Sequence, residues 1–136
     1  MKQTSNVKGQ LAVSKAELRA FELGYIPCRP LFDWRYDLII DDFKSLRRIQ
    51  VKYADGKLSH SEGSVRVKLE YIDRKKHIYT YDKDEIDGLV VYIPKIDKLC
   101  FFPPEVFVGK RDLCVRISPP KNHQKTNILY ADKYYW

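Results

Sequence analysis

Two apolar stretches joined by a short connection constrain this chain more than any other feature. Residues 36–41 (YDLIID) carry an apolar run, and residues 46–53 (LRRIQVKY) place polar and apolar side chains at a two-residue period. Both patterns predict β-strands. Residues 41–45 (DDFKS) are short enough to join them as a hairpin, which makes the pair antiparallel.

The register of this hairpin decides which polar groups meet. If Asp41 lies opposite Leu46, the antiparallel pairing places Asp37 opposite Gln50. The two-residue period puts Lys52 on the same face as Gln50. The segment therefore predicts an acid, an amide and a lysine together at one edge of a sheet, a set that suits a divalent metal ion beside a polarised water.

A purely structural interpretation of the same residues remains open. A lone aspartate beside a strand is often a turn or edge residue, and a Gln-Val-Lys strand end is often an amphipathic edge. The apolar run Leu38, Ile39 and Ile40, directly after Asp37, favours a functional site. A carboxylate buried against such a run is costly unless it is paired or binds a metal.

Length and charge limit the function classes. The 136 residues predict a single domain spanning 1–136. The net charge of +7, from 25 Lys and Arg against 18 Asp and Glu, indicates a polyanionic partner. We find no apolar run long enough to span a bilayer and no signal-peptide pattern, so no membrane partner is expected.

The three cysteines, Cys28, Cys100 and Cys114, are widely separated and lie in apolar stretches. They predict reduced thiols in the core of an intracellular, cytoplasmic protein.

The remaining pattern predicts one early helix and several strands. Residues 9–23 carry strong helix formers at helical spacing, closed by Gly24. Further elements are expected as an edge strand at 25–30, a strand at 64–72, a hairpin of 88–93 with 98–102, a strand at 113–117 and a terminal helix at 128–135. This order predicts an α/β fold with a mixed β-sheet, flanking helices and additional β-hairpins.

Four segments together resemble a known family. They are KGQLAVSKAELRAFELGYIPCRP near the start, the YDLIID and RIQVKY hairpin, GLVVYIPKIDKLCFFPPE, and RISPPKNHQKTNILYADKYY near the end. The chain resembles the PD-(D/E)XK endonucleases encoded in group I introns, which are homing endonucleases of the restriction-endonuclease fold and are distantly similar to archaeal Holliday-junction resolvases. The Gln50-Val51-Lys52 triplet resembles the QxK form of that group's third motif.

The resemblance implies a role for each matching residue. Asp37 would be the main metal-binding carboxylate, and Gln50 would give its side-chain oxygen, with the Val51 carbonyl also facing the metal. Lys52 would orient or help deprotonate the attacking water. The implied cofactor is Mg²⁺ or Mn²⁺, and the implied site is catalytic as well as metal-binding.

The chain departs from the family pattern at the first helix. Related enzymes carry a helix glutamate several residues after a Lys-Gly pair, but five residues after Lys8 this chain has Val13. Glu17 lies one turn further on the same face and is our candidate for a shifted catalytic and metal-binding acid. The alternative is a solvated helix glutamate in an ordinary intrahelical pair. The proline of the family name is replaced by Tyr36.

Double-stranded DNA is the expected partner, contacted by basic residues around the hairpin and on the later strands. Asn122, Gln124 and Lys125 lie in the family-like C-terminal segment and would either reach bases or cap structure. The expected DNA-binding set is Lys8, Lys44, Arg47, Arg48, Arg66, Lys68, Arg74, Lys75 and Lys76.

The expected function is therefore a Mg-dependent DNA endonuclease for intron homing, associated with the nucleoid when bound to DNA. Two alternatives remain: a catalytically decayed DNA-binding module, favoured by Val13, and a Holliday-junction resolvase. Cutting both strands needs two active sites, so a homodimer or homotetramer is expected. The terminal aromatics, Tyr130, Tyr134, Tyr135 and Trp136, would either supply an interface or pack on their own core.

Overall fold

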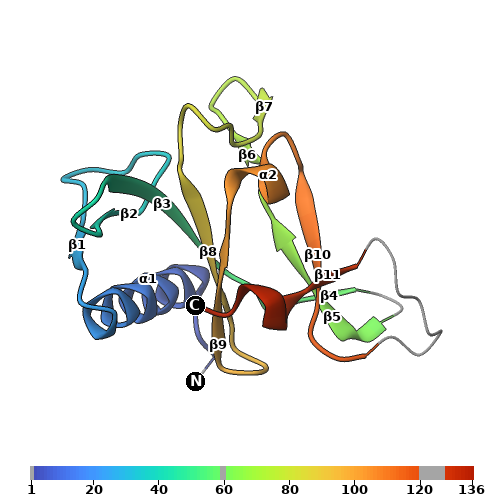
Figure 1. The fold of residues 1–136 in the computed structure, drawn as a ribbon. Helices are drawn as coiled ribbons and strands as arrows, with labels where there is room; N and C mark the ends of the chain where they lie inside the picture. The colour runs from blue at the N-terminus through green and yellow to red at the C-terminus, as the bar shows by residue number, and fades with distance from the viewer. Residues whose placement is uncertain (1, 59–60, 120–127) are drawn as a thin grey trace.

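A computed structural model describes residues 2–58, 61–119 and 128–136. One long helix, α1 (Ser5–Glu22), precedes a series of strands (Figure 1). Sheet A contains β1 (Ile26–Cys28), β2 (Leu38–Asp41), β3 (Leu46–Tyr53), β8 (Gly88–Ile93) and β9 (Lys98–Phe102). Sheet B contains β4 (Gly56–Leu58), β5 (Ser61–Lys68), β10 (Asp112–Arg116) and β11 (Leu129–Tyr130). The small hairpin β6 (Tyr71–Ile72) and β7 (Ile78–Tyr79), the short helix α2 (Pro104–Phe107) and the 3₁₀ turn η1 (Ala131–Tyr134) complete the described elements.

Sheet A is mixed, in the order β1-β2-β3-β8-β9. Its strands pair antiparallel except β3 with β8, which run parallel. The expected β2–β3 hairpin, the β8–β9 hairpin and the edge position of the strand after the first helix are all confirmed. The connection from β3 to β8 carries β4 to β7, and β4 and β5 belong to sheet B.

Sheet A lies between α1 on one face and sheet B on the other (Figure 1). The interior strand β8, which lies between β3 and β9, is buried along its whole length. Its alternate side chains Val90 and Tyr92 join the core beneath α1, whereas Leu89, Val91 and Ile93 join the core shared with sheet B. This explains its continuous apolar sequence, because both faces of the strand are covered.

Helix α1 begins four residues earlier than predicted. Thr4 is its N-cap, and its hydroxyl accepts a hydrogen bond from the Val7 N–H at 3.3 Å. The helix ends where expected, with Gly24 just beyond the C-cap at a φ of +80° that a glycine adopts without strain. The early start was missed because the polar first turn has no apolar period to reveal it.

One expected strand is too long, and one expected helix is wrong. The strand predicted at 64–72 ends at Lys68, and Tyr71 and Ile72 pair instead in the separate β6–β7 hairpin. The helix predicted at 128–135 is a two-residue strand followed by the 3₁₀ turn η1. Residues 129–130 pair in parallel with β10, and this tertiary ladder overrides local helix preference.

The cysteine expectation is confirmed in part. Cys100 is fully buried, as expected of a core thiol, but Cys28 and Cys114 are exposed. Cys28 lies on the edge strand β1, and Cys114 alternates with buried residues on β10, so the neighbouring apolar residues point away from it. All three are free thiols.

The terminal aromatics mostly pack on their own core. The Tyr134 ring lies 4.8 Å from that of Phe102, and the Trp136 ring lies 5.8 Å from that of Phe101, measured between centroids. Tyr135 remains 46% exposed. The last residue is also tied to β9, because the Trp136 N–H donates to the Leu99 carbonyl at 3.0 Å.

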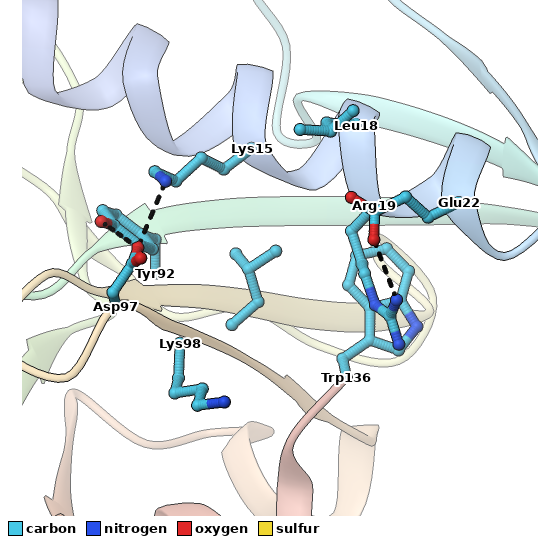
Figure 2. Close-up of a pocket in the computed structure, with 9 residues that line it drawn as sticks. Lys15, Leu18, Arg19, Glu22, Tyr92, Asp97, Lys98 and Trp136 are labelled. Carbon is cyan, nitrogen blue, oxygen red and sulfur yellow. Dashed lines mark hydrogen bonds and ion pairs between the residues drawn. The ribbon is translucent and has the colours of Figure 1, made fainter.

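Figure 2 shows a hollow between α1 and the chain end, lined in part by Leu18 and Trp136. Two of its cations form ion pairs: Lys15 with Asp97 at 3.2 Å and Arg19 with Glu22 at 3.2 Å. No helix in the described part of the chain has the length and apolarity needed to cross a membrane.

Candidate active site

The predicted hairpin register is present. Asp41 pairs with Leu46, and the Asp37 N–H donates to the Ile49 carbonyl at 2.9 Å. The pairing ends with Leu38 opposite Ile49, and Asp37 is the residue just before β2, with its Oδ2 2.8 Å from the Val51 N of β3. The pairing of the acid with the Gln50 amide stays a prediction.

The three polar residues share one face of sheet A. Ile49 and Val51 belong to the core beneath α1. Alternation along β3 therefore turns Gln50 and Lys52 to the opposite face, which looks toward sheet B. Asp37 lies near this face, because it acts electrostatically on Lys52 and on Tyr81. The site is a group of polar side chains on the sheet-B side of sheet A.

Asp37 is held in an environment that opposes its ionisation. Burial raises the pKa of its carboxyl group above the ordinary value, against the effects of the Val51 N–H and the Lys52 ammonium. The Val51 N–H donates to Asp37 Oδ2 at 2.8 Å and fixes the side chain against the strand. Asp33 raises the pKa of Asp37 further, so it lies close enough to repel it.

The pKa of Lys52 is shifted in the direction opposite to that of Asp37. Burial lowers the pKa of its ammonium group, the nearby Asp37 raises it, and Lys68 on β5 lowers it. The Lys52 Nζ also lies 5.4 Å from the centre of the Tyr81 ring. Lys52 is thus a partly desolvated cation with Asp37 as its neighbouring anion.

Gln50 is the amide of the cluster. It is 8% exposed. Carboxylate and amide oxygens are the donors that hard divalent cations prefer, so Asp37 and Gln50 fit such an ion. Among the described residues, no group of three or more His, Cys, Asp or Glu forms a metal cage.

Glu17 lies on α1, which covers the other face of sheet A. Its carboxylate pairs with Arg29, whose Nε donates to Glu17 Oε2 at 3.0 Å. The same guanidinium donates to Gln10 Oε1 at 2.9 Å and lowers the pKa of Asp37. Glu17 therefore pairs with the loop after β1 and not within its own helix. Val13, where the family places an acid, is 7% exposed and packs in the core beneath α1.

Several expected DNA-binding residues make ion pairs within the chain. Arg48 is the most constrained, because its guanidinium donates to both Asp87 carboxylate oxygens and to the Asp84 carbonyl. The other pairs are Lys8 with Asp55, Arg47 with Asp42, Arg66 with Asp112, and Lys68 with Glu70.

The remaining expected DNA-binding residues lie in exposed turns. Lys44 is in the turn between β2 and β3. Arg74, Lys75 and Lys76 form the tip of the β6–β7 hairpin, which Figure 1 shows projecting from one end of the molecule. Asn122, Gln124 and Lys125 lie outside the described residues.

Sequence reasoning missed three residues around the site: Arg29, Asp33 and Tyr81. Arg29 and Asp33 lie in an irregular loop with no periodic pattern, and Tyr81 precedes a turn far along the chain. The run of charged and aromatic residues at 29–36, immediately before Asp37, was the one available signal.

Comparisons with known proteins agree with this arrangement. The model of a family described as PD-(D/E)XK endonuclease matches residues 3–136. The structure of the bacterial homing endonuclease I-Ssp6803I is similar with a TM-score of 0.80 at 22% identity, covering 98% of this chain and 89% of that one. Hjc, a Holliday junction resolvase from the archaeon Archaeoglobus fulgidus, is similar with a TM-score of 0.51 at 10% identity, covering 80% and 84%. A search of curated proteins finds no match. These findings confirm the expected restriction-endonuclease-like fold.

Proposed function

Since the chain belongs to the PD-(D/E)XK endonuclease family, we propose that it hydrolyses phosphodiester bonds in double-stranded DNA in a metal-dependent reaction. The observation that carries the proposal is the proximity of Asp37 and Lys52 beside the buried amide of Gln50, on one face of sheet A. The net charge of +7 supports a polyanionic substrate. The likeness in fold to a homing endonuclease supports a site-specific homing role.

Asp37 and Gln50 would hold Mg²⁺ or Mn²⁺, with the Val51 carbonyl as a further oxygen donor. A bound divalent ion supplies a polarised phosphate and a water of lowered pKa. Because Gln50 brings an oxygen without charge, the protein offers a weak site by itself. DNA phosphate or a second carboxylate would complete it. Our candidate for that carboxylate is Glu17, which would have to exchange its ion pair with Arg29, a residue that also acts electrostatically on Asp37.

Lys52 would orient the attacking water and offset charge on the phosphate in the transition state. Its burial lowers the pKa of the ammonium group, which eases proton exchange with that water. The Val51 N–H holds Asp37 Oδ2, so the carboxylate is positioned before substrate arrives.

The test is nicking of supercoiled plasmid DNA in Mg²⁺. Asp37→Asn should abolish cleavage while keeping or tightening DNA binding, because it removes a negative charge near the scissile phosphate. Lys52→Ala should abolish cleavage and weaken binding somewhat. Lys15→Ala is the matched control, since the Lys15 Nζ also lies over an aromatic ring, 4.8 Å from the centre of Tyr92, but Lys15 belongs to α1 on the other face of sheet A. Wild-type cleavage by either site variant would refute this active site.

The same assay separates the alternatives. A binding module would shift plasmid or duplex mobility without nicking it, and the buried Val13 is the observation that favours this outcome. A resolvase would cut a four-way junction in preference to a linear duplex. The junction is included as a substrate because the fold is similar to that of the archaeal enzyme. A homing enzyme would instead cut linear DNA at a reproducible position.

A further inference from the structure

The loop between β1 and β2 exposes large apolar side chains beside the candidate active site. Leu31 is 101% exposed, Phe32 71% and Trp34 61%. We call residues 31–34 the apolar tip. Large apolar side chains that lie together and exposed are unusual on the surface of a monomeric protein, and they indicate a binding role.

The apolar tip is clamped at both ends. On one side Arg29 pairs with Glu17 of α1. On the other side Arg35 pairs with Glu85 and lies over the Tyr71 and Tyr79 rings, 5.4 and 5.9 Å from their centres. The Phe32 and Trp34 rings also contact one another edge to face, with centroids 6.2 Å apart. The tip is therefore presented on a fixed base.

Its surroundings indicate what the tip would contact. The tip ends at Trp34, three residues before Asp37, and Asp33 within it also raises the pKa of Asp37, so the tip borders the site. Arg35 joins the tip to the β6–β7 hairpin, whose exposed turn carries Arg74, Lys75 and Lys76. The apolar tip therefore has the candidate catalytic acid Asp37 on one side and the cationic β6–β7 turn on the other. This arrangement suits a ligand that carries both phosphates and bases able to stack.

We propose that the apolar tip (residues 31–34) is a wedge that inserts between bases of duplex DNA next to the scissile phosphate at the Asp37 site. This rests on the proposed nuclease function and assigns the tip a part in substrate binding. Apolar and aromatic side chains enter base steps and kink the duplex, while cations hold the flanking phosphates. The β6–β7 turn supplies those cations.

Tryptophan fluorescence tests the insertion directly. The chain has two tryptophans, so Trp136→Phe leaves Trp34 as the reporter. Phenylalanine keeps a ring against Phe101, which Trp136 contacts now. Short labelled duplexes are titrated in EDTA, where no cleavage occurs, and anisotropy of the label follows binding. Stacking on bases should reduce Trp34 emission by about twofold or more at saturation.

Three outcomes would overturn the wedge. If Trp34 emission is unchanged while the duplex is bound, the tip does not insert between bases, and the nuclease proposal is unaffected. A shift of Trp34 emission with protein concentration, without DNA, means that a second copy covers the tip. Absence of duplex binding refutes both proposals together.

Substitutions test what the wedge does. The double change Leu31→Ser and Phe32→Ser should slow cleavage of intact duplex by about tenfold, because unstacking is lost. A mismatch placed beside the cleavage position should restore most of the cleavage rate, because the bases at a mismatch are already partly unstacked. Val7→Ser is the matched control, because Val7 is an exposed apolar residue in the first turn of α1. Wild-type cutting of intact duplex by the double variant would contradict the proposal while leaving the cleavage function standing.

Discussion

The site residues differ from the surface ion pairs of this protein in the direction of their pKa shifts. Burial raises the pKa of Asp37 and lowers that of Lys52, so each charged form is disfavoured although the two attract one another. In the pair of Arg48 with Asp87, hydrogen bonding lowers the pKa of the acid instead. Desolvated charges that lack full compensation are typical of functional sites.

Gln50 is the residue through which metal affinity can be tuned. Gln50→Glu adds a charged oxygen beside Asp37 and should tighten Mg²⁺ binding by about tenfold. Isothermal titration calorimetry of the DNA-free protein measures this. Asp37→Asn is the paired variant and should weaken binding. Equal Mg²⁺ affinity in wild type and Gln50→Glu would show that this amide does not contact the ion.

Glu17 can act as a ligand or as a positioning residue for Arg29. If it supplies the missing helix acid, Glu17→Gln should lower the cleavage rate by about a hundredfold or more, and higher Mg²⁺ should partly restore it. If Glu17 only holds Arg29, the rate should fall modestly without rescue by metal. The Mg²⁺ dependence of plasmid nicking therefore separates the two roles, and wild-type activity would exclude both.

Among the strands, β8 depends on Gly88 at its start for close packing within sheet A. A methyl group there would lie 2.4 Å from Phe101 Cζ and 3.1 Å from Ile49 Cδ1. Phe101 would have to leave Trp136, so Gly88→Ala should destabilise the fold by about 1 to 3 kcal/mol. Gly9→Ala is the control, because nothing lies within 4 Å of that position in α1 and alanine favours helix. Urea unfolding compares them, and an unchanged midpoint for Gly88→Ala would contradict the argument.

The parallel junction of β3 and β8 is secured by Arg48 and Asp87. The Arg48 N–H donates to Asp87 Oδ2 at 2.7 Å, and the Asp87 N–H donates back to the Arg48 carbonyl at 2.8 Å. Because both side chains are partly exposed, Asp87→Asn should cost only about 1 to 2 kcal/mol at neutral pH.

This contribution depends on pH in a defined direction. The pKa of Asp87 is lowered in the folded state, so its stabilisation is present above the unfolded value near 3.8 and is lost as pH falls through the folded pKa. Unfolding free energies of wild type and Asp87→Asn should therefore converge in acid. A difference that persists there would show that the carboxylate's charge is not what stabilises the junction.

For the whole molecule, we predict a symmetric dimer or a dimer of dimers. Each active site cuts one strand, so cutting both strands needs two copies. Tyr134 and Trp136 are occupied within the chain, but Leu18 and Phe21 on α1 are 59% and 64% exposed and offer apolar area. Sedimentation velocity with and without target DNA measures the assembly. Monomer alone under both conditions would refute this prediction.

The β2–β3 hairpin and its polar residues follow from the sequence alone. A period of two, a short connection and an apolar run are local properties, and together they place Asp37, Gln50 and Lys52 on one face of the sheet. The β8–β9 hairpin follows from the same local signals. Strand pairing between neighbours along the chain needs no information about the rest of the fold.

The surroundings of that hairpin depend instead on the tertiary structure. The break after Lys68, the pairing of residues 129–130 with β10 and the contacts of Arg29 all involve groups far apart in the sequence. The burial that shifts the pKa of Asp37 and Lys52 arises because sheet B and the Tyr81 segment cover the face of sheet A near which they lie. Long-range packing decides how far a side chain is desolvated and which groups it pairs with. The periodicity of a single strand contains no information about either.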